Sequence, residues 1–239
     1  MFTGGLTLER MMIYGARIAV FLLIIPIHES AHGLMAKWLG DDTAEKEGRI
    51  TLNPMAHLDV AGFILMLLLG FGWAKPVPVN VSNLKHRRAG YALVSAAGPL
   101  SNLIAAFLGA AVCTVILSTE KGQIVALEQL LGEVQQGNEV WVAVLMLLLN
   151  FVQINVGLAM FNLIPLPPLD GFNLVRAFLP AKADRWLFEH QHTVSGAFIV
   201  LILVASYVPE VNAPLMYVIE KVSDFIWWSV SWIEPLMSK

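Results

Sequence analysis

Two histidines and a glutamate near the start of the chain have the types and the spacing of a metal-dependent hydrolytic site. They lie in His28-Glu29-Ser30-Ala31-His32, which has the pattern H-E-x-x-H. On a helix, positions i and i+4 lie on the same face, so both imidazoles can bind one metal ion. The glutamate lies next to that face, where its carboxylate can take a proton from water on the metal. The pattern therefore predicts a metal site with its own general base.

The alternative is a pair of packed histidines without a metal. Residues 11–27, which precede the motif, are almost wholly apolar. Polar side chains without partners are costly in such surroundings. A metal ion would satisfy both His28 and His32, so the metal site is the favoured interpretation.

The composition favours a chain that lies in a lipid bilayer. Hydrophobic residues make up 57% of the chain and charged residues only 14%, whereas a soluble domain averages about 25% charged residues. The net charge of −3 says little about partners, and we expect the bilayer as a partner and no nucleic acid. The single cysteine, Cys113, excludes an intrachain disulfide and a cysteine-based zinc cluster, and we expect it to be a packing residue.

We expect an all-α polytopic membrane protein, with a bundle of about five to six transmembrane helices. The expected spans are residues 11–39, 89–117, 140–164 and 186–208, followed by residues 215–232. The last of these segments either crosses the membrane or lies in its interface.

Residues 43–88 break this pattern and predict an insert after the first helix. Residues 48–52 alternate as a short strand would, and residues 76–81 are typical of an extended strand limited by its prolines. Residues 61–73 are apolar but too short to cross about 30 Å of hydrocarbon as a helix, which fits a re-entrant or interfacial segment. We therefore predict a small β-hairpin or re-entrant insert that returns to the side from which it entered.

The distribution of lysine and arginine predicts the orientation. The insert and the loop at residues 165–185 are basic, whereas Lys121 is the only basic residue in the polar loop at residues 118–139. The positive-inside rule places the first two regions in the cytoplasm and the third outside. We therefore expect a multi-pass membrane protein, with its metal site toward the cytoplasm.

Asp170 is the candidate third metal ligand. A catalytic zinc usually has three protein ligands and a water molecule. Asp170 lies in the proline-rich loop at residues 165–185, which the predicted topology brings to the same side as the end of the first helix. Asp170 can therefore meet His28 and His32. The alternative is an aspartate that caps a helix or serves a turn.

Four motifs together resemble the site-2 protease family of intramembrane zinc metalloproteases. They are the H-E-x-x-H of His28–His32, the N-P-M-A-H-L-D of Asn53–Asp59, the A-G-P-L-S-N of Ala97–Asn102, and Asn162–Gly171, and they cover roughly residues 20 to 180. One departure is Phe172, where many members have a second glycine after Asp-Gly. No PDZ-like or CBS-like domain is visible, so the chain resembles a compact bacterial member.

The resemblance implies regulated cleavage of a transmembrane protein substrate within the bilayer, with one zinc ion per chain. By the family pattern, the two histidines and Asp170 would ligate zinc, and Glu29 would be the general base. Asn162 would lie beside the scissile carbonyl, and His57 would face the cleft from the insert. The residues alone leave another reading open, in which Asn162 hydrogen-bonds a neighbouring helix and His57 serves a turn.

On this basis, residues 1–185 are expected to form the protease core and residues 186–239 the C-terminal membrane helices. A competing interpretation is a transporter or channel that binds a divalent cation. Such a protein would have carboxylates on several helices, and the intramembrane acids are few here. A second alternative is an inactive relative that binds clients without cleaving them, against which the intact Glu29 argues. The oligomeric state is left open, a homodimer included.

Overall fold

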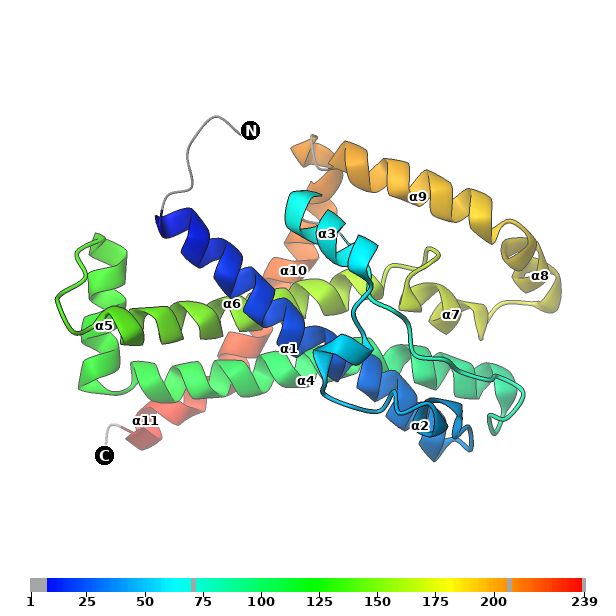
Figure 1. Ribbon diagram of the computed structural model, residues 1–239, viewed down its shortest axis with the longest axis horizontal. Helices are drawn as coiled ribbons and strands as arrows, with labels where there is room; N and C mark the ends of the chain where they lie inside the picture. The colour runs from blue at the N-terminus through cyan, green and yellow to red at the C-terminus, as the bar shows by residue number, and fades with distance from the viewer. Residues whose placement is uncertain (1–7, 70–71, 206–207, 238–239) are drawn as a thin grey trace. The chain divides into compact units, whose positions relative to one another are not determined.

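The computed structural model describes residues 8–69, 72–205 and 208–237, and it contains helices and no strands over these residues (Figure 1). The elements are α1 (Leu8–Trp38), α2 (Thr43–Lys46), a 3-10 turn (Pro54–Ala56), α3 (Val60–Leu69), α4 (Arg87–Leu117), α5 (Glu120–Leu131), α6 (Glu139–Asn162), α7 (Asp170–Arg176), α8 (Ala181–Glu189), α9 (Gln191–Ala205), α10 (Pro209–Val230), a second 3-10 turn (Ser231–Ile233) and α11 (Glu234–Met237). The predicted all-helical class is therefore confirmed for the described residues.

The chain forms two compact units. Residues 23–102 and 157–219 form one, which contains every predicted site residue and is called the site unit here. The other is formed by the start of α1, residues 103–156 and the chain from Glu220 onward. The metal-site candidates can therefore be described within a single unit.

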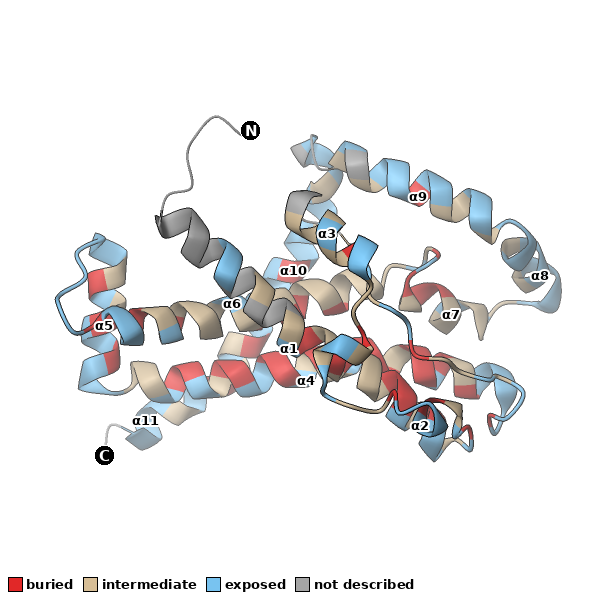
Figure 2. Cartoon of the chain, viewed as in Figure 1, coloured by how far each residue is buried: buried red, intermediate tan, exposed pale blue. Residues whose placement is uncertain are grey.

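The second half of α1 is the central helix of the site unit, and Figure 2 shows buried residues gathered there. Ile24, His28, His32 and Ala36 are all buried, at 1%, 7%, 9% and 0% exposure. These residues recur every fourth position and so form one stripe along the helix. Pro26 lies inside α1 without ending it. Both histidines of the motif consequently face the core of the unit.

The predicted β-hairpin of the insert is wrong in the described residues. Residues 48–53 form turns and bends, and residues 72–80 are extended without pairing as a strand. Prolines at positions 76 and 78 remove two hydrogen-bond donors from the second segment. Several of the other main-chain groups bond to side chains or loops, for example the N–H of Asn80 to the Asp41 carboxylate. The alternation at residues 48–52 does not correspond to a strand, since Leu52 is exposed and Arg49 is the buried residue of this stretch.

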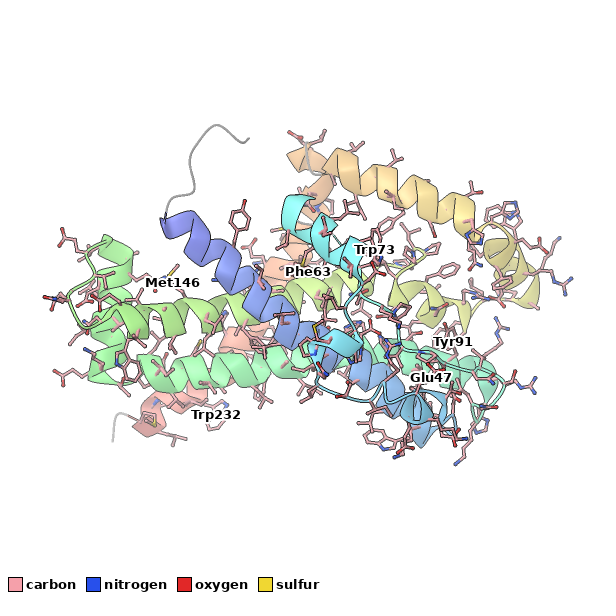
Figure 3. The ribbon with its side chains drawn as sticks, in the orientation of Figure 1. Glu47, Phe63, Trp73, Tyr91, Met146 and Trp232 are labelled. Atoms are coloured by element: carbon pink, nitrogen blue, oxygen red, sulfur yellow. The ribbon has the colours of Figure 1, made fainter. Side chains whose placement is uncertain are left out.

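The apolar stretch at residues 61–73 contains the short helix α3, of 10 residues. After α3 the chain returns to pass closely over Gly62. A Cβ at Gly62 would lie 2.1 Å from the carbonyl oxygen of Trp73, so this approach requires glycine. Trp73 and Phe63 of this stretch are labelled in Figure 3. A short apolar helix agrees with the expectation from length, and whether it enters the membrane stays a prediction.

The other unit has its own apolar cluster, built from α4, α5 and α6. Cys113, Val125, Val142 and Leu145 are its buried members, and Trp227 of α10 packs against them. Cys113 is completely buried, as expected for a packing residue. The prediction of a loop at residues 118–139 is wrong for its first part, because residues 120–131 form the helix α5.

Helix α5 has clear end signals. The side chain of Thr119 accepts a hydrogen bond from the N–H of Gly122, and Gly132 ends the helix in the left-handed conformation, with φ of 71°. Both are typical helix caps. The many glutamates made the region resemble a loop, although its caps were present in the sequence.

Two of the described helices are long and apolar enough to cross a membrane. They are α4 and α6, whose most apolar windows have mean hydropathies of 2.2 and 2.1. Helix α9 contains a shorter apolar stretch, Gln191–Ile202. These helices are consistent with a membrane protein, and the number of crossings stays a prediction.

Candidate metal centre

His28, His32 and Asp170 converge on one point in the site unit. The Nε2 atoms of the two histidines are 3.1 Å apart. The Oδ2 atom of Asp170 lies 3.2 Å from Nε2 of His28 and 3.4 Å from Nε2 of His32. In a tetrahedral zinc site with bonds of about 2.0–2.2 Å, ligand atoms are roughly 3.3–3.5 Å apart. The three atoms therefore form a triangle close in size to one face of such a site.

The far side of each imidazole fixes its tautomer. Nδ1 of His28 lies 2.6 Å from Oδ1 of Asn102, and Nδ1 of His32 lies 2.7 Å from the carbonyl oxygen of Val94. Both partners are oxygen acceptors, so Nδ1 of each neutral ring carries the hydrogen and donates it. Each Nε2 then presents a lone pair to the point of convergence.

A bound cation would satisfy this arrangement. Oδ2 of Asp170 is buried and has no hydrogen-bond partner among the described residues. Two lone pairs and a carboxylate oxygen repel one another unless positive charge lies between them. Two imidazoles and one carboxylate are also the ligands of catalytic zinc sites with an open fourth position. Among the described residues, these three side chains form a group that could hold a metal ion, and they fit zinc.

Gly98 of α4 forms a wall of the centre. A Cβ at this position would lie 2.4 Å from Nε2 of His32 and 2.6 Å from Cε1 of His28. No side chain fits there without displacing an imidazole. The absence of a side chain at Gly98 therefore lets α4 approach the face of α1 that carries His28 and His32.

Asp170 is the first residue of α7, and the packing of this short helix fixes its position. A Cβ at Gly171 would lie 2.3 Å from the carbonyl oxygen of Leu163, so only glycine permits this approach to the end of α6. Phe172 is buried, and its ring lies 5.3 Å beneath the guanidinium of Arg176. The departure from the family pattern at Phe172 is thus a packed anchor for α7.

Glu29 lies next to His28 on α1 and outside the group of three converging side chains. Its Oε2 atom accepts a hydrogen bond of 2.9 Å from the N–H of Val77. The neighbouring Ser30 donates from Oγ to the carbonyl oxygen of Thr51 at 2.7 Å. The motif helix is therefore attached to the insert at two successive residues.

The structure does not bring His57 or Asn162 into the group of three. His57 is completely buried, its Nε2 donates to the carbonyl oxygen of Thr51 at 2.9 Å, and its own carbonyl oxygen accepts from the N–H of Lys75 at 2.8 Å. Asn162 donates from Nδ2 to the carbonyl oxygen of Leu158, one turn earlier in α6. Catalytic roles for both residues stay predictions.

A cavity of about 590 Å³ lies beside the loop that carries Asp170. Its lining includes Pro167, Phe172, His192 of α9 and Tyr91 of α4, the last of which is labelled in Figure 3. Asp170 and the two histidines are not among the lining residues. The cavity is therefore next to the metal centre and not part of it.

Sequence reasoning did not assign a role to Asn102 or to the Val77 N–H. Asn102 lies in the A-G-P-L-S-N motif, and a polar residue in an apolar helix indicates that its side chain has a partner. The Val77 contact joins residues far apart in the chain through a main-chain group, and no side-chain type marks such a contact.

Comparison with known proteins agrees with this geometry. The family model for Peptidase family M50 matches residues 16–206. A protein of Bacillus subtilis (strain 168) named "Putative zinc metalloprotease YwhC" is 37% identical over 215 residues, which cover 86% of this chain and 92% of the relative. No solved structure matches the chain. The chain therefore belongs to peptidase family M50, the site-2 protease family, and is a metalloprotease.

Proposed function

We propose that this protein is a zinc-dependent intramembrane endopeptidase that cleaves transmembrane segments of membrane-protein substrates. One zinc ion per chain would be held by His28, His32 and Asp170. The observation that carries the proposal is the convergence of their three acceptor atoms within 3.1–3.4 Å of one another. The helix that supplies both histidines also supplies Glu29 at the spacing of a general base.

Each residue of the candidate centre has a separate role in the proposed reaction. Zinc, when bound, acts as a Lewis acid and makes water a nucleophile near neutral pH. Asn102 and the carbonyl of Val94 hold the two imidazoles with Nε2 toward the metal. The Glu29 carboxylate would take the proton of the attacking water and later give it to the leaving amine.

The apolar helices α4 and α6 and the membership of peptidase family M50 support a location in the membrane. We propose a multi-pass protein of a bacterial inner membrane, with the centre toward the cytoplasm. The lysines and arginines of residues 43–88 and 165–185 support this orientation. The proposed substrate is accordingly a transmembrane protein, which would have to unwind locally so that its main chain can reach the centre.

Replacement of the proposed base tests the function. We expect Glu29→Gln to keep its zinc and to lose cleavage of a model transmembrane substrate by about 10²–10⁴-fold, because glutamine cannot accept the proton. Glu47→Gln is the matched control, since Glu47 is exposed and lies in the turn after α2. Cleavage by the purified proteins would be followed on gels. Activity of Glu29→Gln equal to that of Glu47→Gln would refute the proposed mechanism.

A further inference from the structure

The segment at residues 75–83, which is extended as far as Asn80 and then turns, is anchored at its first end by Arg49. Arg49 is buried, and its Nη2 donates to the carbonyl oxygens of Lys75 at 2.8 Å and of Pro76 at 3.2 Å. The N–H of Lys75 donates to the carbonyl oxygen of His57 at 2.8 Å. Three hydrogen bonds thus fix the main chain where the segment begins.

Asp41 anchors the other end of the same segment. It is completely buried at the end of α1. Its Oδ2 accepts from the N–H of Asn80 at 2.7 Å, and its Oδ1 accepts from Nδ2 of Asn83 at 3.0 Å. Hydrogen bonds to a charged group are stronger than neutral ones, so this anchor holds the segment firmly against α1.

Val77 lies between the two anchors and contacts the motif helix through its main chain and its side chain. Its N–H donates to Oε2 of Glu29 at 2.9 Å. The residue is 9% exposed, and its Cγ1 lies 3.3 Å from the position that a Cβ on Gly33 would occupy. The hydrogen bond to Glu29 is therefore part of a packed interface between the segment and α1.

We propose that the Val77 N–H, held in place by Arg49 and Asp41, positions the Glu29 carboxylate for proton transfer. This inference rests on the proposed function, in which Glu29 is the general base. A glutamate side chain has several rotatable bonds, and fixing one oxygen before the reaction removes the cost of ordering it during the reaction. Within the described residues no hydrogen bond to the second carboxylate oxygen, Oε1, is found, so this oxygen can take the proton.

The alternative is that this contact blocks the base until substrate displaces the segment. The anchors at both ends and the burial of Val77 favour a fixed scaffold over a displaceable one. The two models predict opposite effects when the hydrogen bond is removed.

Val77→Pro removes the N–H, and a proline fits an extended segment that already contains Pro76 and Pro78. Val79→Pro is the matched control, because Val79 also follows a proline and its N–H makes no hydrogen bond within the described part of the chain. Val77→Ala separates loss of the side chain from loss of the N–H. All three variants would be assayed for kcat, KM and zinc content with a detergent-solubilised transmembrane substrate.

We expect Val77→Pro to lower kcat about tenfold or more, with KM and zinc content unchanged. Val79→Pro should remain within about twofold of the wild type, and Val77→Ala should exceed Val77→Pro about tenfold in kcat. Equal kcat for the two proline variants, a raised kcat in Val77→Pro, or loss of its zinc would each overturn the inference.

Arg49 provides a second test if Val77→Pro does not fold. Arg49→Gln should lower kcat while zinc is retained, and Arg49→Lys, which keeps a donor for the carbonyls, should recover most of the loss. Wild-type kcat in both Arg49 variants would contradict the inference. Failure of the proposed function is distinguishable, because then the wild type does not cleave or Glu29→Gln still does.

Discussion

At the scale of single residues, the candidate metal centre depends on groups outside the three proposed ligands. The buried amide of Asn102 and the carbonyl of Val94 decide which nitrogen of each imidazole faces the point of convergence. Such outer partners keep a metal ligand oriented and raise its basicity. The H-E-x-x-H motif therefore supplies two of the candidate ligands, and their neighbours orient them.

Replacement of Asn102 should weaken zinc binding. Asn102→Leu removes the acceptor for Nδ1 of His28, so the ring is free to rotate or to change tautomer, and we expect about 10–100-fold weaker zinc binding. Asn150→Leu is the control, because Asn150 is exposed and its side chain donates to the carbonyl of Met146 in its own helix, α6. Competition with a chelating dye measures the affinity. Equal affinities of the two variants would contradict this role of Asn102.

Gly98→Ala should remove zinc without a change in any ligand. The new Cβ would lie 2.4 Å from Nε2 of His32, so an imidazole must move out of its place. Gly157→Ala is the control, since nothing lies within 4 Å of a Cβ at that helical position. Zinc content by atomic absorption distinguishes them. A Gly98→Ala protein with full zinc content would show that the centre is less tightly enclosed than described.

At the scale of elements, the sequence predicts α1 well, because its apolar length and motif spacing both indicate a helix. The sequence also predicts a loop at residues 165–185, whereas residues 170–176 form α7 and α8 begins at Ala181. It does not predict the insert. The alternation at residues 48–52 and the prolines near Val77 fit a hairpin, yet the main chain of the insert bonds to Glu29, Asp41 and Arg49. Such contacts join distant parts of the chain, and local pattern cannot specify them.

The anchor at Asp41 should make the stability of the site unit depend on pH. Burial alone would raise the pKa of Asp41, but hydrogen bonds from Thr43, Asn83 and the N–H of Asn80 outweigh it and hold the pKa below its ordinary value of 3.8. A carboxyl group whose folded pKa is lowered stabilises the fold above about pH 4, and this stabilisation is lost as the pH falls further.

Asp41→Asn should therefore lower the unfolding temperature at pH 7, by the equivalent of about 1–3 kcal/mol for lost charged hydrogen bonds. The difference from the wild type should shrink below about pH 4. Asp42→Asn is the control, because Asp42 is exposed and its carboxylate pairs with the exposed Lys46 one turn later. Thermal unfolding in detergent at several pH values measures this effect. A constant difference from pH 7 to pH 3 would contradict the assignment.

At the scale of the whole molecule, composition and charge predict a membrane protein, and α4 and α6 agree with that class. The all-helical fold follows from the same physics, since a helix satisfies its main-chain hydrogen bonds internally in hydrocarbon. The number of crossings does not follow, because short apolar elements such as α3 and α9 can lie in the interface or enter the bilayer. The sequence predicts that Asp170 meets α1 only because the charge distribution places the end of the first helix and residues 165–185 on the same side of the membrane.

Zinc content and cleavage, measured on the same preparations of the intact protein, test the central claim most directly. We predict about one zinc ion per chain and cleavage of a transmembrane substrate for the wild type, and neither for the double variant His28→Ala with Asp170→Ala, because the two changes leave a single protein ligand. Full zinc content in the double variant, or cleavage by the wild type after complete removal of zinc, would contradict the account.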